Sequence, residues 1–318
     1  MDIMARALVF PGQGSQAVGM GRELAEAFAD ARAVFDEVDD ALGQKLSKLM
    51  FEGPESDLTL TENAQPALMA VSLAVVNVLK KQGGLDIAKA ARFVAGHSLG
   101  EYSALCAAGT FSLADTARLL KLRGRSMQKA VPVGQGAMAA LMGADLEAAQ
   151  AIAAEAAAET GKVCAAANDN APGQVVISGD VEAVDRAIAI AATKGFKRAV
   201  KLPVSAPFHC PLMQPAADAM AEALAGVTMT APVVPVVANV IARAISDPAE
   251  IRARLVEQVC GAVRWRESML YIKAEGVDTV VELGSGKVLT GLAKRIDKEL
   301  AGVSVQTPAD IESFLKTL

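Results

Sequence analysis

The stretch FVAGHSLGEYSAL, residues 93–105, decides the fold. Apolar residues run into a serine that stands between two glycines, and helix-forming residues follow at once. Residues 96–100 match the pattern G-x-S-x-G, in which a serine stands on a sharp strand-to-helix turn with its hydroxyl exposed. The same residues also fit an ordinary turn whose serine only caps the helix. The neighbouring segments therefore have to distinguish a nucleophile from a cap.

The segments around this turn alternate between strand and helix patterns. Short apolar runs bounded by Gly, Pro or Asn predict strands, and apolar residues at helical spacing predict helices. This alternation predicts an α/β fold with a largely parallel sheet. The expected strands are 7–10, 91–96, 233–239 and 278–284, and the expected helices are 22–42, 66–81, 99–109 and 113–130.

The middle of the chain follows a different order, β-α-β-β-α-β, which is typical of a ferredoxin-like unit. We therefore predict an inserted ferredoxin-like domain over residues 134–203. Residues 1–133 and 204–318 then form one larger catalytic domain. The expected elements of the insert are a strand at 136–143, a helix at 146–159, strands at 162–169 and 173–179, a helix at 181–195 and a strand at 197–205.

Composition excludes several classes of protein. The 318 residues are 52% hydrophobic and 21% charged, which is typical of a globular protein. A net charge of -5 without a basic stripe argues against nucleic-acid binding. The apolar run 66–81 contains Ser72 and Asn77 and is shorter than a membrane span of ~20 residues. No secretory pattern opens the chain, and its four cysteines form no C-x-x-C pair, so we expect a cytoplasmic protein.

Two glycine-rich stretches resemble nucleotide-binding loops but lack the required context. FPGQGSQA, residues 10–17, matches G-x-G-x-x-A after a strand, yet a long helical pattern follows where a second strand is needed. ELGSGKVLTG, residues 282–291, lacks the first glycine of a phosphate loop, because Val281 stands at that position. We therefore predict no bound nucleotide cofactor.

A nucleophilic serine needs a base, and the chain has only two histidines. His97 is adjacent to Ser98, and neighbouring side chains in such a turn point apart. His209, in SAPFHCP, is then the candidate base, with a purely structural histidine as the alternative. Cys210 has no independent partner in the sequence, and we expect a small buried side chain there.

Six motifs in order resemble the malonyl-CoA:acyl-carrier-protein transacylases, over nearly the whole chain. They are FPGQGSQ, GHSLGEYSAL, LRGRSMQ, NAPGQVVISG, APFHCPLM and ELGSGKVLTGL. The resemblance implies an α/β-hydrolase-like large domain with a ferredoxin-like insert, and an active site in the cleft between them.

The resemblance also implies roles for individual residues. Ser98 is the acyl-accepting nucleophile, and His209 is its base and later the acid for the leaving thiol. The backbone carbonyl of Gln258 orients the histidine, and the backbone N–H groups of Gln13 and Leu99 hold the oxyanion.

Selectivity is implied to rest on two further residues. Arg123 binds the malonyl carboxylate, a pairing that suits the planar guanidinium. The sequence alone does not separate Arg123 from Arg118 or Arg125. Phe208, next to the histidine, matches the malonyl-selective form of related polyketide acyltransferases.

These roles imply a ping-pong transfer through a malonyl ester of Ser98. Malonyl-CoA is the donor and the phosphopantetheine thiol of acyl carrier protein is the acceptor. Coenzyme A is then a substrate, and no cofactor or metal is needed. We expect a monomer with no nucleic-acid or membrane partner.

Three other functions share parts of this pattern. A serine hydrolase would need a third acid, for which Asp180 and Asp185 are candidates, although both lie in the expected insert. A polyketide acyltransferase would load another acyl unit. A carrier-binding scaffold would not need Ser98, His209 and Arg123 together.

Overall fold

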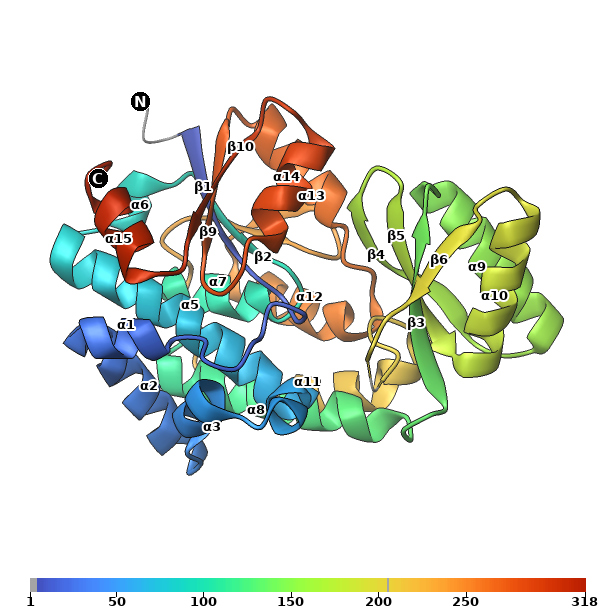
Figure 1. Ribbon diagram of the computed structural model, residues 1–318, viewed down its shortest axis with the longest axis horizontal. Coiled ribbons are helices and arrows are strands. Elements are labelled where there is room, and N and C mark those ends of the chain that lie inside the picture. The colour runs from blue at the N-terminus through green and yellow to red at the C-terminus, as the bar shows by residue number, and fades with distance from the viewer. Residues whose placement is uncertain (1–4, 205) are drawn as a thin grey trace.

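The computed structural model describes residues 5–204 and 206–318. The protein is a mixed α/β structure with a parallel-rich central sheet and a separate antiparallel sheet (Figure 1). This agrees with the fold class expected from the alternation of strands and helices.

The central sheet has the strand order β10-β9-β1-β2-β7-β8. β1 pairs in parallel with β2 and β9, and only β8 runs antiparallel to its neighbour. All four expected strands are present, whereas β8 and β10 were not expected. The strands are β1 (Arg6–Phe10), β2 (Phe93–Gly96), β7 (Val236–Ala238), β8 (Arg243–Ile245), β9 (Thr279–Leu283) and β10 (Ala301–Val305).

Helices cover both faces of this sheet, as a parallel sheet requires. Along β1, Leu8 and Phe10 face one core, and Ala7 and Val9 face the other. The first core is formed with helices that include α5 (Thr61–Gly83), α7 (Gly100–Ala107) and α8 (Leu113–Ala130). The second is formed with α13 (Trp265–Ala274) and α14 (Val288–Ile296).

The remaining helices complete the layers seen in Figure 1. Within the described residues, no helix combines the length and the apolar character needed to cross a membrane. The further helices packed around the central sheet are α1 (Arg22–Ala27), α2 (Ala29–Leu42), α3 (Leu46–Glu52), α4 (Glu55–Thr59), α6 (Ile87–Ala90), η2 (Pro211–Met213), α11 (Gln214–Ala225), α12 (Pro248–Cys260) and α15 (Pro308–Leu315).

The single helix expected over residues 22–42 is wrong, because the chain breaks at Phe28. The backbone of Phe28 is extended, with φ -131 and ψ 119, and it separates α1 from α2. Leu24 and Phe35 still reach the same core from the two helices. Apolar spacing shows which residues reach the core, but it is compatible with both one helix and two.

The antiparallel sheet has the order β4-β5-β3-β6, and its elements follow the expected β-α-β-β-α-β order. The strand expected at 197–205 is shorter than predicted, because Pro203 has no N–H to donate. Ser205, in that expected strand, lies outside the described residues. The elements are β3 (Gly136–Met142), α9 (Leu146–Thr160), β4 (Cys164–Ala171), β5 (Gln174–Asp180), α10 (Val181–Thr193) and β6 (Arg198–Lys201).

Strand β4 is linked to the larger part of the molecule through Val263, which lies between α12 and α13. The backbone N–H of Asp169 donates to the carbonyl of Val263 at 2.9 Å, and Val263 N–H donates to Ala167 at 2.8 Å. Asp169, which is 1% exposed, also pairs with Arg266 of α13. Asn170 of β4 lies 2.8 Å from Nε2 of His97, the residue directly after β2, so β4 is close to the carboxyl end of β2.

Candidate active site

Ser98 stands on a strained turn between β2 and α7, with a left-handed φ of 54. Two glycines make the turn possible. A Cβ built on Gly96 would lie 1.9 Å from the backbone carbon of Gly100, and one built on Gly100 would lie 2.3 Å from the carbonyl oxygen of Phe10. The chain crosses itself so closely that only glycine fits at either position. The motif therefore has a steric basis, and the turn exposes the serine.

Asn239, at the end of β7, holds this turn. Its side-chain Oδ1 accepts the backbone N–H of Ser98 at 2.8 Å, and its Nδ2 donates to the carbonyl of Gly96 at 2.8 Å. Asn239 was not expected from the sequence. An asparagine directly after an apolar strand, at the edge where β2 also ends, is the only signal that pointed to it.

His209 lies next to Ser98, 2.7 Å from the serine Oγ to the histidine Nε2. Nδ1 of the same ring lies 2.8 Å from the backbone carbonyl of Gln258. Because a carbonyl only accepts, Nδ1 carries the proton, and Nε2 accepts from the serine hydroxyl. Burial, together with the charge of Arg123, lowers the pKa of His209 to about 3. The ring is therefore a neutral base at physiological pH.

Arg123 of α8 reaches the same serine from the other side and is 1% exposed. Its Nη2 donates to Ser98 Oγ at 3.1 Å and to the side-chain oxygen of Gln258 at 2.9 Å. Its Nη1 donates to the side-chain oxygen of Gln65 at 2.7 Å. These hydrogen bonds go to uncharged oxygen atoms, so none of these partners neutralises the charge of the guanidinium. Gln65, a site residue that sequence analysis missed, lies within an apolar helix.

The two neighbouring arginines are placed differently. Arg118 pairs with Asp115 and its side chain is 58% exposed, and Arg125 pairs with Glu62 and is 64% exposed. Both are on the solvent side of α8. The geometry therefore separates Arg123 from the two alternatives that the sequence left open.

Leu99 and Gln13 both line the cavity in front of Ser98. Leu99 is the first residue before α7, so its backbone N–H lies at the positive end of the helix. The loop that carries Gln13 packs against the Ser98 turn, since a Cβ on Gly12 would lie 2.7 Å from the carbonyl of His97. Thr61 donates to the Gln13 side chain at 2.8 Å and so anchors this loop.

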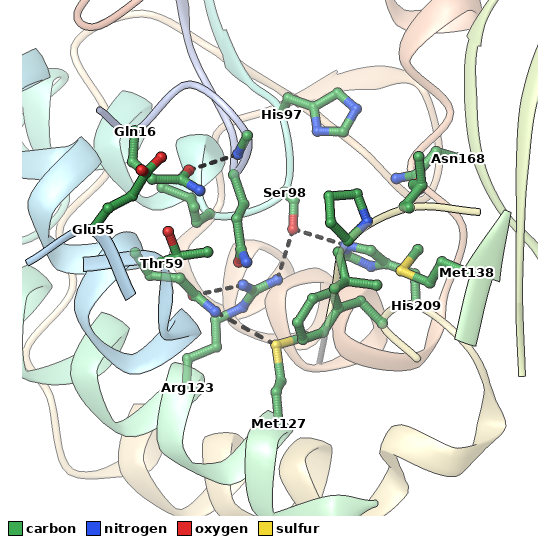
Figure 2. Close-up of a pocket in the computed structure, with 18 residues that line it drawn as sticks. Gln16, Glu55, Thr59, His97, Ser98, Arg123, Met127, Met138, Asn168 and His209 are labelled. Atoms are coloured by element: carbon green, nitrogen blue, oxygen red, sulfur yellow. Dashed lines mark hydrogen bonds between the residues drawn. The ribbon is translucent and has the colours of Figure 1, made fainter. Parts of the chain in front are cut away.

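The cavity has a volume of about 570 Å³. Figure 2 shows Ser98 at its centre, between Arg123 and His209. Much of the lining is apolar, which is typical of a small-molecule site with a few fixed polar groups. Phe208, 8% exposed, belongs to this apolar lining, together with Met127, Met138, Leu202 and Val204.

His97 points away from the serine (Figure 2). Its Nε2 lies 2.8 Å from the side-chain oxygen of Asn170, and its ring packs 5.6 Å from that of Trp265. Cys210 is fully buried, and burial raises the pKa of its thiol to about 11. Neither side chain is therefore placed as a nucleophile or as the partner of Ser98.

The acids considered for a hydrolase triad lie elsewhere. Asp180 accepts the backbone N–H of Val163 at 2.8 Å, and Asp185 pairs with Lys201, both within the antiparallel sheet region. The position of a triad acid, next to Nδ1 of His209, is taken by the carbonyl of Gln258. Within residues 5–204 and 206–318, no group of three His, Cys, Asp or Glu side chains is arranged to hold a metal ion.

Comparison with known proteins defines the class. The acyl transferase domain family matches residues 7–308, so the protein is an acyltransferase. The malonyl CoA-acyl carrier protein transacylase of Bacillus subtilis is 46% identical over 312 residues, which cover 98% of this chain and 96% of that protein. The chain belongs to the malonyl-CoA:acyl-carrier-protein transacylase family.

Solved structures agree with this assignment. The acyl-carrier-protein S-malonyltransferase of Bartonella henselae is 58% identical and superposes with a TM-score of 0.95, covering 99% of each chain. A malonyl-transacylase in complex with a type II polyketide acyl-carrier protein is 43% identical, with a TM-score of 0.94, and covers 98% of this chain and 99% of that one.

Proposed function

We propose that this enzyme transfers the malonyl group of malonyl-CoA to the phosphopantetheine thiol of acyl carrier protein, by a ping-pong mechanism. The observation that carries the proposal is the convergence on Ser98 Oγ of a neutral base, His209 at 2.7 Å, and a buried cation, Arg123 at 3.1 Å. Neutral histidine activates a serine, and a buried arginine selects a substrate that carries a carboxylate.

In the first half-reaction, Ser98 Oγ attacks the thioester carbon while Nε2 of His209 takes the hydroxyl proton. The backbone N–H groups of Leu99 and Gln13 stabilise the oxyanion that develops. The carbon–sulfur bond breaks, and His209 returns the proton to the leaving thiolate of coenzyme A. A malonyl ester of Ser98 remains.

In the second half-reaction, the carrier thiol gives its proton to His209 and attacks the ester. The serine leaves with that proton, and malonyl-carrier dissociates. The carbonyl of Gln258 keeps Nδ1 protonated throughout, so Nε2 is the nitrogen that exchanges the proton. Coenzyme A takes part only as the leaving group of the substrate malonyl-CoA, and the scheme includes no cofactor.

Arg123 supplies selectivity for malonyl. No ion pair joins its guanidinium to Asp115 or Glu62, the carboxylates that pair with other cations of α8. A malonyl carboxylate in the cavity completes a buried charge pair, whereas an acetyl group leaves the cation unpaired. Phe208 narrows the apolar side of the cavity beside the reacting serine.

The domain assignment is part of the proposal. Residues 134–203 form a ferredoxin-like insert, and residues 1–133 and 204–318 form an α/β-hydrolase-like catalytic domain. The strand order β4-β5-β3-β6 supports the first assignment, and the serine turn at the carboxyl end of β2 supports the second. We further propose a cytoplasmic monomer that binds malonyl-CoA and acyl carrier protein and has no nucleic-acid or membrane partner.

Mass spectrometry of the intact protein after mixing with malonyl-CoA, acetyl-CoA and methylmalonyl-CoA tests the function. We expect a malonyl adduct, located on Ser98 by peptide mapping, that persists until acyl carrier protein is added. Rapid turnover of malonyl-CoA without carrier would identify a hydrolase instead. Preferred loading of methylmalonyl would identify an acyltransferase for another extender unit.

The preferred acceptor is tested by a second step, which starts from the loaded enzyme. One relative is known in complex with a polyketide carrier. Offering the loaded enzyme a fatty-acid carrier and a polyketide carrier in competition measures which is preferred. We expect faster transfer to the fatty-acid carrier.

A further inference from the structure

A buried carboxylate, Glu101, lies in the first turn of α7, three residues after Ser98, and takes no part in the proposed chemistry. It is 1% exposed. One of its oxygen atoms, Oε2, accepts the backbone N–H of Asn239 at 2.9 Å and the side-chain Nε2 of Gln258 at 3.0 Å. Both donors belong to residues that contact the serine turn directly.

Gln258 connects this carboxylate to the catalytic groups. Its Nε2 donates to Glu101 and, at 3.1 Å, to the carbonyl of Ser98. Its Oε1 accepts from Nη2 of Arg123 at 2.9 Å. An amide nitrogen has two hydrogen atoms to donate, and a third acceptor, Oδ1 of Asn239, also lies 3.3 Å from this one. While Glu101 is ionised, all three neighbouring oxygen atoms can only accept.

With Glu101 ionised, the network therefore permits only one orientation of the Gln258 amide. If the amide were flipped, its oxygen would face the Glu101 carboxylate and the Ser98 carbonyl, and its nitrogen would face the donors of Arg123. Every contact would then join two acceptors or two donors. With the observed orientation, Arg123 is held between Gln258 on Nη2 and Gln65 on Nη1, and the remaining hydrogen of Nη2 points to Ser98.

We propose that Glu101 is a positioning residue that fixes the side-chain amide of Gln258 and, through it, aims the guanidinium of Arg123 at the acyl group on Ser98. Glu101 touches neither substrate nor serine hydroxyl. The inference rests on the proposed function, since it assigns to Glu101 the geometry on which malonyl selectivity depends.

The energetic cost of Glu101 supports a positioning role. Burial raises the pKa of Glu101 to about 7, against the opposing effect of hydrogen bonds from Asn239 and Gln258 and of the charge of Arg123. A buried carboxyl group is costly unless its oxygen atoms accept hydrogen bonds. An apolar side chain would leave the N–H groups of Asn239 and Gln258 without this acceptor, so packing alone does not account for the carboxylate.

Two conservative variants of Glu101 separate the position of its accepting oxygen atom from the charge of its side chain. Glu101→Gln keeps the length of the side chain and can place its carbonyl oxygen where Oε2 lies, but it has no charge. Glu101→Asp keeps the charge and withdraws the oxygen by one methylene. The measured quantity is the ratio of malonyl to acetyl loading rates on Ser98, together with labelling of Ser98 by a fluorophosphonate, which needs the serine and His209 but not Arg123.

We expect Glu101→Gln to keep the loading ratio within about threefold of wild type, and Glu101→Asp to lower it about tenfold. Fluorophosphonate labelling should stay within about threefold of wild type in both variants. A purely structural defect would instead lower malonyl loading, acetyl loading and labelling together.

A double-mutant cycle tests whether Glu101 acts through Gln258. Gln258→Met removes the amide and keeps the backbone carbonyl that holds His209. By itself it should lower the ratio about tenfold, and adding Glu101→Asp to it should lower the ratio no further. Glu282→Gln is the matched control, because Glu282 is a fully buried carboxylate that accepts backbone N–H groups of α14, and its substitution should leave the ratio unchanged.

The proposal requires a retained ratio in Glu101→Gln, a lowered ratio in Glu101→Asp and no additivity with Gln258→Met; any other combination overturns it. A lowered ratio in the Glu282→Gln control also overturns it. Arg123→Ala, measured in parallel, distinguishes failure of the proposed function from failure of the inference about Glu101. If that variant keeps the wild-type ratio, the proposed function fails and the inference with it. If it loses the ratio while the Glu101 variants behave otherwise than expected, only the inference fails.

Discussion

The two histidines of the chain occupy two regions that are alike in most respects and differ in one. His209 is buried and His97 is half-buried, and burial lowers the pKa of both. Both make a hydrogen bond of 2.8 Å to an oxygen atom, His209 to the carbonyl of Gln258 and His97 to the side chain of Asn170. They differ in the second ring nitrogen: that of His209 faces Ser98, and His97 points away from it (Figure 2).

The comparison teaches that neither adjacency in sequence nor a lowered pKa identifies the base. His97 is the residue next to the serine, but the sharp turn directs neighbouring side chains apart. His209 is far away in sequence. The backbone carbonyl of Gln258 binds Nδ1 of its ring, and this contact directs Nε2 toward Ser98. The proposed role of base rests on the ring atom that faces Ser98.

The largest effect is expected from removing Ser98, the proposed nucleophile. Ser98→Ala should abolish covalent malonyl loading, because within residues 5–204 and 206–318 Ser98 supplies the hydroxyl that hydrogen-bonds both His209 and Arg123. Mass spectrometry of the intact protein measures the adduct. Ser103→Ala is the matched control, since Ser103 is a fully buried serine on α7 and should not be needed for loading. A malonyl adduct on the Ser98→Ala protein would show that the nucleophile is misassigned.

The next effect tests the comparison directly. His209→Ala should slow acylation by roughly two to four orders of magnitude, which is the usual contribution of general acid–base catalysis. His97→Ala should slow acylation far less, because it removes a contact to Asn170 and not the base. Single-turnover loading rates of both variants, with circular dichroism to verify folding, provide the measurement. Equal and severe losses in two folded variants would contradict the assignment of the base.

The predictable part of this site is the part encoded in short motifs. Ser98 and its two glycines form a contiguous pattern, and a chain with two histidines leaves few candidates for the base. Asn239, Gln65 and Glu101 were missed, because a polar residue in an apolar segment does not show which distant group it will bond. Such residues, each polar and each next to an apolar run, are nevertheless the signal that a buried network exists.

The fold divides in the same way. The β-α-β-β-α-β order of residues 134–203 follows from local periodicity and was predicted. The order of strands in the central sheet, with β1 between β9 and β2, depends on contacts between distant segments that periodicity does not contain. The break at Phe28 was missed because the apolar spacing of α1 and α2 is continuous across it.

Selectivity should change when Arg123, the cation beside His209, is removed. Arg123→Ala should weaken malonyl loading by about 2–5 kcal/mol, as expected for truncating one partner of a buried charge pair. Acetyl loading should fall far less, because acetyl offers no carboxylate to pair. The measurement is the ratio of malonyl to acetyl loading rates. Arg125→Ala is the control, since Arg125 is exposed and pairs with Glu62. If the ratio fell in Arg125→Ala and not in Arg123→Ala, the substrate carboxylate would bind at Arg125 instead.

The smallest effect concerns stability, and here the two histidine regions should behave alike. A histidine whose pKa is lowered by folding binds its proton more weakly in the native state than in the unfolded state. Stability is therefore lost as the pH falls below the unfolded pKa of 6.5 and continues to fall toward the native value, about 3 for His209. For His209 the loss between neutral pH and about pH 5 should be about 2 kcal/mol.

Replacing either histidine by glutamine removes an imidazole whose protonation is opposed by burial in the folded protein. His209→Gln and His97→Gln should each make the free energy of unfolding less dependent on pH between about 7 and 5, where unfolded histidine becomes protonated. Urea unfolding of wild type and the two variants at several pH values measures these slopes. Differences from wild type are the useful quantity, because Glu101, whose pKa is raised to about 7, contributes an opposite slope in the same range. A variant that kept the wild-type slope would show that its histidine is not held neutral in the folded protein. If both slopes flatten while only His209→Ala loses acylation, burial accounts for the shared pKa shift, and contact with Ser98 accounts for catalysis.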